Sequence, residues 1–131
     1  MRAGFDTFGV DVRLDAVRDA IAYAAGEGLL VRGWCADLTR CRLPNCRFDL
    51  VVVSRYLQRD LFGSLAAALK RGGILLYETF TTAQLAHGVG PRSPDHLLEP
   101  GELRRAFDQL ETLFYEEVAS PEAVARLAAR R

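Results

Sequence analysis

Two apolar runs joined by a helical stretch constrain the fold of this chain more than any other feature. Leu50 to Val53 ends in three consecutive valines, which favour an extended, fully buried strand. The next segment is predicted to be a helix that stops at the glycine pair Gly72–Gly73. Its apolar positions on one helical face are Leu61, Leu65, Ala68 and Leu69. Ile74 to Tyr77 is the second apolar run, and two strands joined by a helix predict a parallel pair with a right-handed crossover.

Polar residues follow both apolar runs, at the point where each predicted strand ends. Ser54, Arg55 and Tyr56 come after the first run, and Glu78 and Thr79 come after the second. In open α/β sheets the ligand lies at the carboxyl ends of the strands, so both groups fall where a ligand is expected. The charge and the phenol of the first group would hold an anionic or polar substrate, or they form an ordinary surface pair.

The N-terminal third of the chain predicts two further strands with a helix between them. Residues 5–10 are interpreted as a short strand that ends at Asp11, and apolar residues recur at helical spacing from about Leu14. Residues 29–36 form the next strand, which closes at Asp37. This order of elements is typical of an open α/β sheet, and we expect the whole chain to form a single domain.

The C-terminal third begins with a long polar stretch and ends in an ambiguous segment. Residues 81–99 are longer than most connections in a compact domain, which makes them a candidate lid or substrate loop. A helix is predicted after Pro100, and residues 111–118 alternate well enough for a strand. Residues 123–130 fit either a helix or a strand paired with the preceding one.

Three isolated side chains each allow a functional and a structural interpretation. Asp11, at a strand end, would accept hydrogen bonds from two ribose hydroxyls, or it caps the following helix. Asp37 would accept a hydrogen bond from an exocyclic amine of a base, although a turn-forming aspartate is the commoner case. His96 would serve as a proton shuttle, or it is a solvated loop histidine.

Composition excludes several classes of function. Seventeen basic residues balance seventeen acidic ones, which argues against a nucleic-acid partner and a basic membrane patch. The sequence has neither an apolar run of the ~20 residues that span a bilayer nor a recognisable signal peptide, and we therefore expect a cytoplasmic protein. Cys35, Cys41 and Cys46 lack the spacing of a metal site, so no bound metal is expected.

Several motifs, in order, resemble class I S-adenosylmethionine-dependent methyltransferases. The likeness covers nearly the whole chain, from about Gly4 to Arg130, and is closest to small bacterial enzymes of the tellurite-resistance methyltransferase type. The motifs that carry the family likeness are GFDTFGVD, GWCADL, FDLVVVSRYLQRDL and LKRGGILLYETF, and the SRYL, LLYETF and HLLEPGEL stretches carry the closer one. The resemblance implies a Rossmann-like, open and mostly parallel sheet with a C-terminal antiparallel hairpin, which favours a strand over residues 123–130.

The resemblance also implies S-adenosylmethionine as the cofactor and methyl transfer to a small acceptor as the function. By that resemblance Asp11 would hold the cofactor's ribose, and Asp37 with Leu38 would meet its adenine. The residues that would line the methionine end of the cofactor and the mouth of the substrate site are Ser54, Arg55 and Tyr56. Those that would shape the acceptor site are Glu78, Thr79, Gln84 and His96.

One part of the family pattern is missing. Members begin with a strand, a glycine-rich loop of the type D/E-x-G-x-G and a helix, all ahead of the segment that matches Phe5, whereas this chain starts at Met1. We therefore expect residues 1–131 to bind the cofactor weakly or not at all. The missing strand is central in the family sheet, between the strands that end at Asp11 and Ser54, and its loss would expose two strand edges.

Three outcomes follow for such a gap: the sheet closes on itself, another chain fills it, or the chain is an incomplete version of a longer protein. The alternative function is accordingly a non-catalytic methyltransferase-like module that completes its sheet by self-association or with a partner chain.

Overall fold

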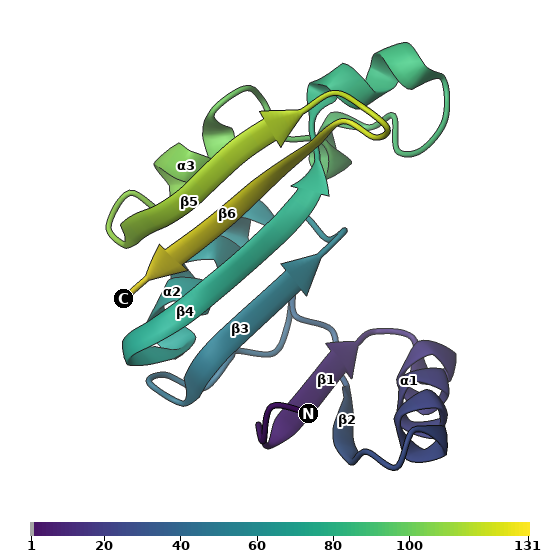
Figure 1. Cartoon of the computed structure of the whole chain (residues 1–131). Helices are drawn as coiled ribbons and strands as arrows, with labels where there is room; N and C mark the ends of the chain where they lie inside the picture. The colour runs from purple at the N-terminus through teal and green to yellow at the C-terminus, as the bar shows by residue number, and fades with distance from the viewer. Residues whose placement is uncertain (1) are drawn as a thin grey trace. The chain divides into compact units, whose positions relative to one another are not determined.

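The computed structural model describes residues 2–131, which form two compact units (Figure 1). The first unit ends at Arg42 and the second spans Leu43–Arg131. The strands form two hydrogen-bonded sheets, one in each unit. The single-domain interpretation stays a prediction. No helix among residues 2–131 is both long enough and apolar enough to cross a membrane.

The first unit is a parallel strand pair with one helix. Strand β1 (Thr7–Asp11) pairs with β2 (Val31–Cys35), and helix α1 (Leu14–Gly26) connects them. The helix packs against β2 at Gly33, where an added Cβ would lie only 2.4 Å from a methyl group of Val17. A glycine is required there because any side chain would separate the helix from the strand. The predicted order of strand, helix and strand is confirmed.

The second unit contains a four-stranded sheet of order β3-β4-β6-β5. Its strands are β3 (Phe48–Ser54), β4 (Leu69–Phe80), β5 (Glu111–Val118) and β6 (Val124–Arg130). Strands β3 and β4 are parallel, as predicted, whereas β6 is antiparallel to both of its neighbours. The strand interpretation of the last segment, which the resemblance favoured, is therefore confirmed, and the sheet is mixed.

The helix between β3 and β4 is shorter than predicted. A 3₁₀ turn, η1 (Arg59–Leu61), leads into α2 (Phe62–Ala68), and the chain is already extended at Leu69, which pairs with Phe48. The prediction that the helix runs to Gly72–Gly73 is wrong. The side chain of Leu69 is fully buried in this extended conformation, and burial of an apolar side chain of that size favours it.

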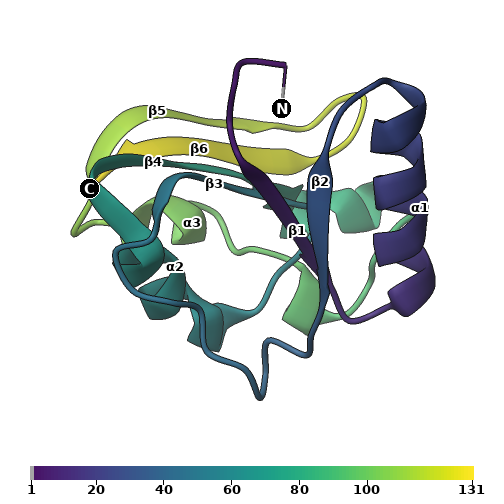
Figure 2. The ribbon, with the colours of Figure 1, turned by 90° about the horizontal axis from the view of Figure 1, so that it is seen from below.

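Both helices of the second unit, α2 and the short α3 (Glu102–Ala106), lie on the same side of its sheet (Figure 2). On that side Phe62, Tyr77 and Phe107 pack together, with ring centroids 5.1–6.0 Å apart. The prediction of a fully buried strand over Leu50–Val53 is wrong, because Val52 points away from these helices and is 63% exposed.

The long connection after β4 is ordered by short turns. It contains η2 (Thr82–His87) and η3 (Pro94–His96), and its two ends meet where Thr81 pairs with Leu98. Helix α3 then begins after Gly101, close to the predicted start after Pro100.

Candidate functional site

The carboxyl ends of β3 and β4 bring together four of the predicted site residues. Ser54 lies opposite Glu78 in the strand pair, and the backbone N–H of Arg55 donates to the Glu78 carbonyl over 2.8 Å. The buried hydroxyl of Tyr77 donates to the Tyr56 carbonyl over 2.7 Å, and burial raises the pKa of this phenol well above its usual range. The backbone of residues 54–56 is thus held against β4.

Arg55 has an unusual backbone conformation and a fixed side chain. Its φ of 53° lies in the left-handed region, which is uncommon for a residue other than glycine. The guanidinium pairs with Glu122 at 2.5 Å and lies 4.8 Å from the centroid of the Phe80 ring. The side chain is therefore held over the end of β4 by an ion pair and a cation–π contact.

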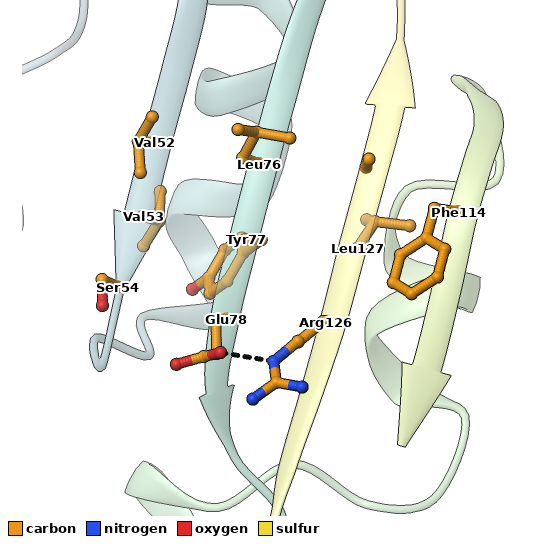
Figure 3. Close-up of a pocket in the computed structure, with 10 residues that line it drawn as sticks. Val52, Val53, Ser54, Leu76, Tyr77, Glu78, Phe114, Arg126 and Leu127 are labelled. Atoms are coloured by element: carbon orange, nitrogen blue, oxygen red, sulfur yellow. Dashed lines mark hydrogen bonds and ion pairs between the residues drawn. The ribbon is translucent and has the colours of Figure 1, made fainter. Parts of the chain in front are cut away.

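A charged row crosses the sheet beside Ser54. Arg126 of β6 donates to Glu78 of β4 at 2.6 Å (Figure 3). It also donates to Glu116 of β5 at 2.8 Å. Glu78 and Arg126 border an open hollow of about 360 Å³ on the sheet face opposite α2 and α3. Its apolar lining includes Val52, Leu76 and Phe114 (Figure 3).

Two predicted acceptor-site residues lie in the interior of the second unit. Thr79 and Gln84 are each 2% exposed. The Gln84 amide donates to the Val89 carbonyl over 3.0 Å, and its Oε1 accepts the Ala123 N–H over 2.7 Å. Gln84 thus binds the 81–99 segment to the start of β6. The predicted roles of both residues at the acceptor site stay predictions.

His96 is exposed and belongs to a segment that Arg59 holds in place. The Arg59 guanidinium donates to the carbonyls of Pro94 over 3.1 Å and Leu97 over 2.8 Å, and to the Glu102 carboxylate over 2.6 Å. The hydrogen bond from Arg59 lowers the pKa of Glu102. The segment predicted as a lid or substrate loop is therefore anchored near both ends, by Gln84 and by Arg59.

The two predicted cofactor carboxylates lie in the first unit, and each forms a local turn contact. Asp11 is exposed, and its Oδ1 accepts the Arg13 N–H over 2.8 Å just ahead of α1. Asp37 accepts the backbone N–H of Thr39 over 2.9 Å and its hydroxyl over 2.6 Å, and the hydroxyl contact is the main cause of a lowered pKa at Asp37. Leu38, beside Asp37, is half-buried.

Several contacts of the site were not predicted from the sequence. Glu116 pairs with Arg126, and Glu117 accepts the Gly101 N–H over 2.7 Å. Strand alternation places Glu116 and Arg126 on one face once their pairing is known, but no local pattern gives that pairing. Among residues 2–131 no cluster of three or more metal-binding side chains occurs, and all three cysteines are exposed.

The sequence matches no protein-family model and no curated protein, whereas solved structures resemble the fold closely. TehB from Haemophilus influenzae superimposes with a TM-score of 0.76 at 15% identity, over 98% of this chain and 50% of that one. An S-adenosylmethionine-dependent methyltransferase from Mesorhizobium loti gives a TM-score of 0.75 at 21% identity, over 99% of this chain and 83% of that one.

A third similar structure is the [4+2]-cyclase SpnF, with a TM-score of 0.74 at 18% identity, over 95% of this chain and 65% of that one. This chain thus spans half of TehB and less than two thirds of SpnF. Identities this low establish a shared fold and leave the reaction open, as the cyclase illustrates. The chain has the fold of class I S-adenosylmethionine-dependent methyltransferases.

Proposed function

We propose that this chain takes part in methyl transfer from S-adenosylmethionine to a small polar acceptor. The observation that carries the proposal is the similarity to S-adenosylmethionine-dependent methyltransferases over nearly the whole chain. Polar residues at the carboxyl ends of β1, β3 and β4 support it, because such sheets bind their ligands at those ends.

The polar parts of the cofactor are assigned in this proposal to residues of the first unit. The exposed Asp11 carboxylate would accept hydrogen bonds from the ribose hydroxyls, and Asp37 with Leu38 would meet the adenine. Ser54, at the end of β3, would line the methionine end. S-adenosylmethionine supplies the activated methyl group when it is bound.

The residues at the ends of β3 and β4 would orient the acceptor. Arg55 and Tyr56 offer a cation and a phenol, and Glu78 offers a carboxylate. All three lie where the backbone after β3 is hydrogen-bonded to β4. Methyl transfer needs an aligned nucleophile and the exclusion of water more than it needs an acid–base pair. These polar side chains favour a small and polar acceptor.

Calorimetric titration of residues 1–131 with S-adenosylmethionine, and with its demethylated product, tests the proposal. We expect weak binding, and we expect Asp11→Ala to abolish it. Asp19→Ala is the matched control, because Asp19 is an exposed carboxylate on α1 outside the predicted site. A folded sample that releases no heat at high micromolar ligand, or equal binding by the two variants, contradicts the proposal.

A second candidate function is a non-catalytic module that completes its sheet with another chain. The strand order supports it, since β3 is an edge strand of its sheet and carries consecutive valines. Under this alternative the chain self-associates or captures a partner, and Asp11→Ala leaves that assembly intact. Light scattering measures it, and a stable, strictly monomeric chain contradicts the self-associating form.

A further inference from the structure

We propose that the Tyr77 hydroxyl is a positioning group, which fixes residues 54–56 in the conformation that the binding site needs. The inference rests on the proposed function, because that function assigns Ser54 to the methionine end of the cofactor and Arg55 and Tyr56 to the acceptor. Tyr77 lies in the core of the second unit and acts through the Tyr56 backbone, not by contact with a ligand.

Arg55 is the residue of this segment whose conformation requires an explanation. Its φ of 53° lies in the left-handed region, where the Cβ of a residue other than glycine is crowded. Such a conformation costs free energy and persists only where the surrounding contacts hold it in place. Residues of this kind cluster at functional sites, and Arg55 directly follows β3, at the strand end where a ligand is expected.

Hydrogen bonds to β4 hold the backbone on both sides of Arg55. On one side the Arg55 N–H donates to the Glu78 carbonyl over 2.8 Å. On the other side the Tyr56 carbonyl accepts the Tyr77 hydroxyl over 2.7 Å. The first bond joins two backbone groups and requires no particular side chain, whereas the second exists only because residue 77 carries a hydroxyl. Tyr77 is therefore the side chain that fixes the far end of this segment.

Packing of the core does not by itself require a hydroxyl at residue 77. The Tyr77 ring lies 6.0 Å from the ring centroids of Phe62 and Phe107, and a phenylalanine would offer the same ring. The side chain is only 3% exposed, and burying a hydroxyl costs free energy unless the hydroxyl finds a partner. The Tyr56 carbonyl is that partner. Burial also raises the pKa of the phenol, which therefore stays protonated and remains a donor at neutral pH.

Hydrogen exchange of Tyr77→Phe, followed by mass spectrometry, tests the proposal, because this variant keeps the ring and loses only the hydroxyl. We expect exchange of residues 54–58 to speed up about fivefold more than exchange of β6, since one hydrogen bond typically changes an equilibrium by about that factor. A general loss of stability would act on β6 as well. Tyr115→Phe is the matched control. Its hydroxyl donates to Glu117 on β5, at the opposite edge of the sheet from β3.

A second measurement connects this conformation with ligand binding. In calorimetric titration with S-adenosylmethionine we expect Tyr77→Phe to raise the dissociation constant about threefold, because a smaller fraction of the chain then has residues 54–56 in the binding conformation. Tyr115→Phe should leave the constant unchanged. If the wild-type chain binds no S-adenosylmethionine, the proposed function fails, while the exchange measurement still decides whether Tyr77 fixes the segment.

Three results would overturn the proposal. Exchange of residues 54–58 that is unchanged in Tyr77→Phe, or that speeds up no more than exchange of β6, would leave Tyr77 with a general role in the core. Faster local exchange with an unchanged dissociation constant would separate the order of the segment from binding. Glu122→Gln weakens the other contact of Arg55, its ion pair. If this variant alone releases the segment, the ion pair holds Arg55 and the Tyr77 hydroxyl does not.

Discussion

Gln84 connects two backbone segments that are distant in sequence. Its amide donates to the Val89 carbonyl and accepts the Ala123 N–H, and the side chain is almost fully buried. We expect Gln84→Ala to lower the free energy of unfolding by about 1–3 kcal/mol, because it leaves a buried N–H without a partner. Urea denaturation measures this change.

Gln109→Ala is the control for that experiment, because Gln109 is exposed. If both variants lose equal stability, Gln84 does not anchor the segment. If Gln84→Ala keeps its stability and loses acceptor turnover instead, the residue belongs to the acceptor site that the resemblance implies.

At the level of residues, the sequence predicted which site residues lie together better than it predicted which of them are buried. Ser54, Arg55 and Glu78 could be expected to meet, since the ends of neighbouring parallel strands coincide. The burial of Gln84 could not be predicted, because it depends on Ala123, 39 positions away. The Arg55–Glu122 pair depends on the same distant segment.

At the scale of elements, Arg59 clamps η3 and α3 together through Glu102. The hydrogen bond lowers the pKa of Glu102 below its ordinary value of 4.5, so the folded state binds its proton less readily than the unfolded state does. The clamp is therefore fully stabilising above about pH 4.5, and its contribution is lost as the pH falls through the folded-state pKa.

Glu102→Gln should consequently destabilise the protein at pH 7 and have a smaller effect at pH 3. We expect a difference of about 0.5–1 kcal/mol at pH 7, since Arg59 is partly exposed. Thermal unfolding across this pH range measures it, with the exposed Asp108→Asn as the control. A destabilisation that is equal at both pH values would show that the charge of Glu102 is not involved.

The boundaries of the strands were harder to predict than their type. The three consecutive valines and the ILLY run favour extended strands, whichever strands they pair with. The start of β4 at Leu69 depends instead on tertiary contacts, including the bond from the Gly72 N–H to the Arg131 carbonyl. Residues 123–130 were ambiguous until their pairing with both β4 and β5 was known.

At the scale of the whole molecule, the predicted open α/β sheet is realised as two hydrogen-bonded sheets in two units. Length and element order predicted the fold class, because alternating strands and helices favour parallel pairing. Uniform burial of the valine run was inferred from the same pattern and is wrong, since Val52 points away from α2 and α3 and is 63% exposed.

The two units differ in the size of their cores. In the described part of the first unit the buried apolar side chains are Val17 and Ala24, whereas β4 and β6 of the second unit bury Leu75, Tyr77 and Leu127. Local opening costs less free energy where fewer apolar contacts are lost. We therefore expect the amides of β4 and β6 to exchange with solvent at least tenfold more slowly than those of β1 and β2.

Hydrogen exchange followed by mass spectrometry measures this difference. Leu75→Ala should speed exchange in β4 and β6, because truncating a fully buried leucine costs about 2–5 kcal/mol. Leu85→Ala, at an exposed position, should leave their protection unchanged. Equal protection of both units in the wild-type chain would mean that the first unit gains stability from contacts other than its own small core, and a ligand or a second copy of the chain would then be the source to test.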